Sequence, residues 1–268
     1  MKKYIVEKYS KAPEQGVADE QSVFRAMSYN IHSGINANKD VNLQRTLNII
    51  GESDADIVAL REVDTEKNAK KTCNQARSLA ESLNMDCVFF PVESNGLRAF
   101  GLAILNRFLF KRHYCDWVPN LYPKLNLRKR DAIQATLQTP AGPIYFFNTH
   151  LSLYKLERSK QLKTLLDNNW LLSVPENEPV IFCGDLNAEA LSKTYRRLKK
   201  YLIDVQKTLD DPLHPKPTFH SKSSFIRIDH MFISNHFTPL KAEVKINKNA
   251  QMASDHLPLI AELEMKKR

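Results

Sequence analysis

Residues 180–190 read VIFCGDLNAEA, in which four apolar residues and a glycine lead into an Asp and an Asn. The apolar run at 180–183 predicts a buried strand, so Asp185 should lie at the end of that strand with no Lys or Arg beside it. An unpaired buried carboxylate is costly, and Asp185 must therefore meet a cation, accept hydrogen bonds or face water. The rest of the chain has to supply its partner.

Polar side chains recur at the ends of other predicted strands. Asn, Glu, Asp and His are the residue types that bind metal ions and phosphates, and here each follows or precedes an apolar run. If the strand ends converge, these side chains surround a single site. The six segments are residues 27–32, 57–62, 144–150, 180–187, 226–230 and 254–256.

Each of these groups has a plainer interpretation when it is taken alone. Asn30 and Asn187 suit turns that follow strands, and Glu62 beside Arg61 suits a surface ion pair. His150 alone suits a structural histidine. One shared site is favoured because chance rarely puts such groups at six strand ends of one chain.

The composition of this predicted site favours a hard divalent cation. Carboxylate and amide oxygens outnumber nitrogens, which suits Mg²⁺, with Mn²⁺ as a substitute, better than zinc. A zinc site would require an H-E-x-x-H motif or a Cys/His set, and the sequence has neither. A cation or a histidinium near Asp185 would explain how this residue keeps its charge.

Short or alternating apolar runs predict ten strands but only four helices. A doubly wound parallel sheet needs a helix for every crossover, so this ratio favours two mixed β-sheets packed face to face with helices outside. Apolar residues at helical spacing start near Leu43, Ala76, Leu162 and Leu191. The predicted strands are residues 23–31, 56–60, 87–92, 100–105, 132–137, 144–149, 180–183, 226–233, 240–246 and 257–263.

The 268 residues fit one large domain or two small ones, and we expect one catalytic domain over residues 23–268. Residues 1–22 read as a partly irregular leader. Glu7 and Lys8 interrupt its apolar run, so it lacks the core of a signal peptide, and no later stretch is long enough to span a bilayer. Four cysteines without C-x-x-C spacing should be reduced thiols. We expect a soluble, cytoplasmic enzyme, whose oligomeric state the sequence leaves open.

The charge balance favours anionic partners. Lys and Arg number 39 against 30 Asp and Glu, which gives a formal net charge of +9. Nucleic acid and an anionic lipid surface are both partners of this kind. Solvated basic faces that keep the protein soluble are the alternative explanation.

In chain order, seven motifs resemble the endonuclease/exonuclease/phosphatase superfamily, which includes DNase I, AP endonucleases, inositol polyphosphate 5-phosphatases and neutral sphingomyelinases. GDLN followed by SDH at this separation is a specific signal, whereas either motif alone is weak. The resemblance covers about residues 25–264 and is greatest to small bacterial members of uncertain substrate. The motifs are SYNIHSG (28–34), DIVALREVD (56–64), FGLAILNR (100–107), YFFNTHLS (145–152), VIFCGDLNA (180–188), IRIDHMFIS (226–234) and SDHLPLIAEL (254–263).

The resemblance implies an α+β fold, a four-layer α/β/β/α sandwich like that of DNase I, with the active site at one end of the paired sheets. It implies that Asp185 orients or deprotonates the attacking water and that Asp229 polarises His256, the remaining acid/base or phosphate-binding group. His150 and Asn187 would hold phosphoryl oxygens. The implied metal ligands are Asn30, Glu62 and Asp255, and the implied substrate-binding cations are Arg98 and Arg130.

Two positions depart from the family pattern. Arg61 stands where many members have Gln before the metal-binding Glu, which puts the local hydrogen bonding in question. Leu102 stands where many members have Asn, which removes one polar contact.

The activity that these observations favour is a Mg²⁺-dependent phosphoesterase, foremost a phosphodiesterase that acts on nucleic acid or a phospholipid-type substrate. A phosphomonoesterase for an inositol phosphate or nucleotide, and a non-catalytic anion-binding module of the same fold, are the alternatives. Repair of abasic DNA is less favoured because residues 201–225 contain no Trp. A calcineurin-type phosphoesterase would need D-x-H and G-N-H-D motifs, which are absent.

Overall fold

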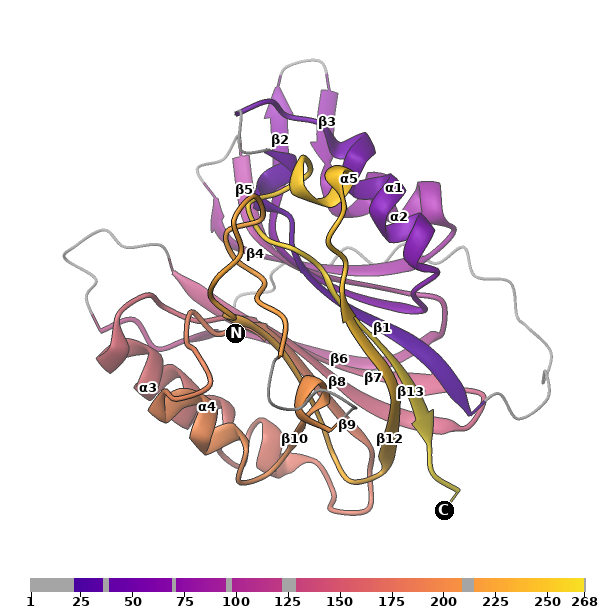
Figure 1. Ribbon diagram of the computed structural model, residues 1–268, viewed down its shortest axis with the longest axis vertical. Coiled ribbons are helices and arrows are strands. Elements are labelled where there is room, and N and C mark those ends of the chain that lie inside the picture. Colours follow the sequence, from indigo (N-terminus) through magenta and orange to yellow (C-terminus); the bar gives the residue numbers. More distant parts are fainter. Residues whose placement is uncertain are drawn as a thin grey trace.

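The computed structural model describes residues 22–35, 39–68, 71–94, 98–121, 129–208 and 215–267. Two β-sheets face each other and are enclosed between two layers of helices (Figure 1). The predicted four-layer α/β/β/α sandwich is therefore confirmed. The predicted leader lies outside the described residues except for Ser22, and the single domain over residues 23–268 stays a prediction.

The first sheet has seven strands in the order β12-β13-β1-β2-β5-β4, with β3 paired to β2. Only β1 and β2 run parallel, so the sheet is mixed. Its strands are β1 (Val23–Asn30), β2 (Ile57–Asn68), β3 (Lys71–Asn74), β4 (Asp86–Ser94), β5 (Arg98–Asn106), β12 (Phe237–Val244) and β13 (Leu259–Met265).

The second sheet has six strands in the order β10-β11-β9-β8-β7-β6. It too contains one parallel pair, β8 with β9, among antiparallel neighbours. Its strands are β6 (Leu109–Val118), β7 (Arg130–Thr139), β8 (Gly142–His150), β9 (Val180–Asp185), β10 (Ile203–Asp204) and β11 (Asp229–Ile233).

The helices form the outer layers of the sandwich (Figure 1). Helices α1 (Leu43–Ser53), α2 (Gln75–Leu83) and α5 (Lys248–Gln251) lie on the first sheet, and α3 (Lys155–Leu165) and α4 (Lys193–Leu198) lie on the second. Asn and Ser side chains cap four of these five helices by accepting a hydrogen bond from the first turn. The remaining short elements are the 3₁₀ turns η1 (His32–Gly34), η3 (Leu171–Ser173) and η4 (Val205–Lys207).

Two apolar clusters hold the layers together. The larger one fills the space between the sheets and reaches α1 and α2 through Ile49, Ile50 and Leu79. The smaller one packs α3 and α4 on the outer face of the second sheet, where Leu162 and Tyr195 join stacked aromatic rings of the strands. Helices α3 and α4 consequently lie side by side on that face.

All ten predicted strands and all four predicted helices overlap observed elements, whereas β3, β6, β10 and α5 were not predicted. Strand β6 is the edge of its sheet, and its exposed positions carry polar residues such as Lys111 and Arg112. An edge strand needs few apolar side chains, so its period-2 pattern is weak. Among the described residues, no helix has the length and apolar character needed to cross a bilayer.

Strand register brings the polar ends together. In each sheet the carboxyl ends of the parallel pair lie at the same end of the sandwich. Asn30 of β1 therefore lies beside Arg61 of β2, and His150 of β8 lies beside Asp185 of β9. The antiparallel strand β11 begins at that end of the sandwich, with Asp229 opposite Asp185. One end of the sandwich therefore collects the residues that the sequence placed at separate strand ends.

One buried carboxylate near this end has no hydrogen-bond partner among the residues that the structure describes. Asp131 on β7 is 1% exposed, and neither of its side-chain oxygens bonds to any residue that the structure describes. Burial raises the pKa of Asp131 well above its usual value, although the charge of Arg130 opposes the shift. The folded protein thus holds a proton that the unfolded chain releases near pH 4.

Stability should consequently fall as the pH rises from about 4 toward the folded-state pKa of Asp131, because the folded state binds more protons than the unfolded state there. The Asp131→Asn substitution should flatten that slope by up to about 1.4 kcal/mol per pH unit, measured by urea unfolding at pH 5 to 8. Glu176→Gln, at an exposed carboxylate, is the control. An unchanged slope in Asp131→Asn would show that another group causes the pH dependence.

Candidate active site

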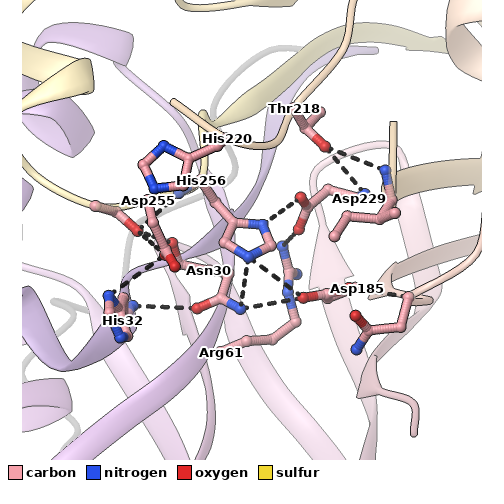
Figure 2. Close-up of polar contacts among 12 residues, drawn as sticks. Asn30, His32, Arg61, Asp185, Thr218, His220, Asp229, Asp255 and His256 are labelled. Carbon is pink, nitrogen blue, oxygen red and sulfur yellow. Dashed lines mark hydrogen bonds and ion pairs between the residues drawn. The ribbon is translucent and has the colours of Figure 1, made fainter. Parts of the chain in front are cut away.

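Asp185 ends β9 in a buried position and has partners from both sheets (Figure 2). Its Oδ2 accepts a hydrogen bond from Nδ2 of Asn30 at 3.1 Å and lies 3.4 Å from Nε2 of His150 and 3.7 Å from Nε2 of His256. Its Oδ1 accepts from the backbone N–H of Asn187 at 3.0 Å. The carboxylate that the sequence left without a partner is thus surrounded by donors and imidazoles.

Asn30, at the end of β1, links two carboxylates. Its Nδ2 donates to Oε1 of Glu62 and to Oδ2 of Asp185, both at 3.1 Å, while its Oδ1 accepts from the backbone N–H of His32 at 3.1 Å. A carbonyl oxygen has a second lone pair, so the bond from His32 leaves Oδ1 one acceptor direction for a ligand. The metal-binding role of Asn30 stays a prediction.

Glu62 owes its direction to a β-bulge in β2. The register between β2 and β5 shifts between Leu60 and Val63, and Glu62 itself has a φ of 55°. A bulge adds a residue to one strand and re-aims the side chains around it. The carboxylate of Glu62 consequently faces the pocket beside Asn30, where its side chain is 16% exposed.

His256 is held by a buried carboxylate that also contacts a buried guanidinium. Nδ1 of His256 lies 2.7 Å from Oδ2 of Asp229, and Nη2 of Arg61 donates to Oδ1 of Asp229 at 2.9 Å. Both oxygens of Asp229 are therefore occupied, and its backbone N–H donates to Thr218. We name this chain of contacts the Arg61–Asp229–His256 relay (Figure 2).

The relay fixes the charge of its members. Burial disfavours the charged form of Asp229, but His256 and Arg61 outweigh it and lower the pKa of Asp229 to about 2. Burial likewise disfavours charged His256, but Asp229, Asp185 and Asp255 raise the pKa of His256 to about 9. His256 is therefore an imidazolium at neutral pH, and its Nε2 lies 3.7 Å from Oδ2 of Asp185 and 3.5 Å from Nδ2 of Asn30.

The role of Arg61 was missed in the sequence, where it counted as a departure from the family pattern. The plainer interpretation of Arg61 as the surface ion-pair partner of Glu62 is wrong. Its side chain is fully buried between the sheets, where Nη1 lies 3.5 Å from Oδ1 of Asn148. Asn148 in turn donates from Nδ2 to the backbone oxygens of Leu60 and Ala103, both at 2.9 Å. An Arg and an Asn inside apolar strand runs were the signals that could have revealed this connection.

His150 and Asn187 form the other side of the site. Nδ2 of Asn187 lies 3.2 Å from Nε2 of His150 and donates to the backbone oxygen of Leu151 at 2.9 Å. Asn187 has a φ of 47°, a conformation that Asn tolerates better than most residues. Burial, followed by the charge of Arg130, lowers the pKa of His150 well below its usual value. His150 is therefore a neutral imidazole that can donate or accept a hydrogen bond.

Asp255 lies in the loop before β13, at the edge of this network. Its Oδ1 is 3.4 Å from Nδ1 of His32, and its side chain is 23% exposed. The preceding Ser254 donates from Oγ to the backbone oxygen of Asn30 at 2.8 Å, which fastens the loop to the end of β1. Asp255 is thus held on the Asn30 side of the site.

A pocket of about 1140 Å³ opens over these groups. The strand ends of the second sheet and the starts of α3 and α4 form its walls. The side chain of Arg98 lies outside the described residues, so its predicted role is left as a prediction. The predicted site residues that line the pocket are Glu62, Arg130, His150, Asp185, Asn187 and His256.

The donor set fits a divalent cation. Asp185, Asp229 and His256 each bring one ligand-type atom within 4.8 Å of the others. Because Asp229 and His256 already bind each other, the partly exposed carboxylates of Glu62 and Asp255 are better suited to a metal ion. Carboxylate oxygens of this kind prefer hard ions.

Both the sequence and the structure of this chain resemble those of known proteins. The model of the Endonuclease/Exonuclease/phosphatase family matches residues 27–256. The uncharacterized protein YbhP of Escherichia coli K12 is 24% identical over 261 residues, covering 92% of this chain and 98% of YbhP.

Two solved structures share the fold. An endonuclease/exonuclease/phosphatase from Beutenbergia cavernae superposes with a TM-score of 0.76 at 21% identity, covering 91% of this chain and 72% of that one. A mannosyl-6-phosphatase from Bacteroides thetaiotaomicron superposes with a TM-score of 0.70 at 21% identity, covering 90% of this chain and 99% of that one.

Replacing Arg61 by Leu should lower the free energy of unfolding by about 3–5 kcal/mol, because it leaves Asp229 buried without its guanidinium. The control Arg77→Leu removes an exposed partner of Glu81 and should cost less than about 1 kcal/mol. Urea unfolding of both variants at pH 7 measures the difference. If the two losses are equal, the buried pair does not stabilise the fold in the way described.

Proposed function

The chain belongs to the endonuclease/exonuclease/phosphatase family and is a hydrolase of phosphate esters, and from this premise we propose that it is a Mg²⁺-dependent phosphodiesterase. The observation that carries the proposal is the position of Asp185. This carboxylate lies at a pocket wall within 3.7 Å of Asn30, His150 and His256, which come from different parts of the chain. A water beside Asp185 would therefore sit among groups that bind phosphoryl oxygens.

In the proposed reaction, Asp185 accepts a proton from the attacking water, whose oxygen forms a new bond to phosphorus while the ester P–O bond breaks. The electron pair of that bond stays on the leaving oxygen, which takes up a proton from solvent. Imidazolium His256 presents its Nε2 proton to the charge that develops on the phosphoryl oxygens. Neutral His150 and the amide of Asn187 hold the same group from the other side. Arg130, which lines the pocket, supports this anion binding.

The proposed cofactor is Mg²⁺, with Mn²⁺ as a substitute. Glu62, Asp255 and Asn30 are the residues proposed to hold it, because they combine two carboxylates with an amide oxygen. When bound, the ion supplies positive charge that neutralises the phosphoryl oxygens.

The proposed substrate is a phosphodiester of the nucleic-acid or phospholipid type. The formal charge of +9 suits both polyanions and anionic lipid. A phosphomonoesterase remains the second candidate, because one protein of the same fold is named a mannosyl-6-phosphatase. The cytoplasmic location stays a prediction.

Hydrolysis of bis-p-nitrophenyl phosphate should require Mg²⁺ or Mn²⁺ and should stop in EDTA, because charge on the phosphoryl oxygens is then left without the ion. Release of p-nitrophenol, followed by absorbance, measures the rate. Restoring excess Mg²⁺ to the EDTA-treated enzyme controls for loss of the protein. Full activity in the chelator would reject the metal-assisted mechanism.

Replacing Asp185 by Asn keeps the size of the side chain but removes its ability to accept a proton. The value of kcat for bis-p-nitrophenyl phosphate should fall by about 10²–10⁴-fold, with a much smaller change in KM. The matched control is Asp116→Asn, which replaces an exposed carboxylate on β6 that does not line the pocket. Unchanged turnover in Asp185→Asn would remove Asp185 from the catalytic role.

A further inference from the structure

Large apolar side chains gather at the mouth of the pocket. Leu153, Leu156 and Leu191 line the pocket and are 68%, 72% and 89% exposed. Phe225, which directly precedes the pocket-lining Ile226, is 74% exposed. Single exposed apolar residues are ordinary on a protein surface, but a group of them around one opening indicates an interaction site.

The three leucines stand where the two outer helices begin. Leu153 directly precedes the N-cap residue Tyr154 of α3, and Leu156 lies in the first turn of that helix. Leu191 directly precedes the capping residue of α4. Because α3 and α4 pack against each other, both starts reach the same pocket mouth.

Basic side chains surround these leucines. In residues 153–165 and 189–200 there are nine Lys and Arg but only two acidic residues, Glu157 and Glu189, and Glu157 is buried. The exposed cations therefore face almost no opposing charge on these two helices. They are Lys155, Lys160, Lys163, Lys193, Arg196, Arg197, Lys199 and Lys200.

We propose that this Leu–Lys face, defined by Leu153, Leu156 and Leu191 with Lys155, Lys193 and Arg196, docks on the surface of an anionic phospholipid bilayer. Leucines that enter the boundary between headgroups and acyl chains, ringed by cations that bind anionic lipid, are the combination used by peripheral membrane surfaces. Leucine side chains cannot stack on bases, and the three leucines outnumber the exposed aromatic residues beside them, Tyr154 and Phe225. The face therefore offers more aliphatic surface, which suits lipid, than stacking surface for nucleic acid.

Docking in this way would bring the mouth of the pocket to the headgroup layer. A phosphodiester that joins a lipid to its headgroup could then reach Asp185 while its acyl chains stay among the leucines. The substrate class that follows is a membrane phospholipid, and this part of the inference rests on the proposed function. The docking itself needs no catalysis and can be measured separately.

Cosedimentation with vesicles in EDTA tests the docking without turnover. The protein should bind vesicles that contain phosphatidylglycerol and phosphatidylcholine, and bind much less to phosphatidylcholine alone. The combined Leu153→Ser, Leu156→Ser and Leu191→Ser variant should bind about tenfold more weakly or worse. The control combines Leu109→Ser, Leu172→Ser and Leu240→Ser, which are 55%, 48% and 44% exposed but do not line the pocket, and should bind as the wild type does.

A charge variant tests the second half of the face. Combining Lys155→Gln, Lys193→Gln and Arg196→Gln should weaken binding to the anionic vesicles. Raising the salt from roughly 50 to 500 mM should weaken vesicle binding by the wild type in the same way, because the screening length is short at high salt. The three leucines and the three cations that are replaced are all exposed. Circular dichroism should therefore show the wild-type fold in the combined leucine variant and in the charge variant.

Two results would overturn the proposal. One is equal vesicle binding by the wild type and the combined leucine variant. The other is an absence of vesicle binding together with salt-dependent binding of a single-stranded oligonucleotide that only the charge variant loses, which would assign the face to nucleic acid. Vesicle binding with no hydrolysis of bis-p-nitrophenyl phosphate would instead uphold the docking and reject the proposed function.

Discussion

A guanidinium buried between two β-sheets is the constraint on which the site depends. Arg61 comes from the first sheet and Asp229 from the second, and neither has any exposed side-chain surface. Leaving either charge alone in that interior would be strongly destabilising, so the two sheets must meet at this end in one register. Asp229 in turn binds His256, and the fold thereby determines the position and the charge of an imidazole in the candidate active site.

The β-bulge in β2 lets a buried guanidinium and a pocket-lining carboxylate follow each other in one strand. Successive residues of a regular strand point to opposite faces of the sheet. Without an irregularity, Arg61 and Glu62 could not both direct their side chains to the inner side of the sandwich. The shift between Leu60 and Val63, with the φ of 55° at Glu62, lets the guanidinium enter the interior while the carboxylate faces the pocket. Asn148 bonds the backbone oxygen of Leu60 beside the shift, so the second sheet supports the bulge of the first.

The sandwich could be predicted from the sequence because its central strands are buried and strongly patterned. The convergence of the polar strand ends could also be predicted from the sequence, since the carboxyl ends of parallel strands lie at the same end of a sheet. Asn30 and Asp185, at two such ends, are joined by a hydrogen bond. Edge strand β6 could not be predicted, because half-exposed strands lack a clear period. Arg61 inside an apolar strand run was a signal of a buried charge, but its partner Asp229 could not be predicted. The two residues are 168 positions apart, and only the packing of the two sheets joins them.

The charges at this end of the fold divide into a buried group and a partly exposed group. The buried charge of Asp229 is matched by Arg61 and by imidazolium His256. Arg130 and Arg158 line the pocket and act on the charges of His150 and Asp185. The carboxylates of Glu62 and Asp255 are instead 16% and 23% exposed, and partly exposed carboxylate oxygens are the ligands that a hard divalent ion takes. The two histidines carry different charges, set by Asp229 for His256 and by burial with Arg130 for His150.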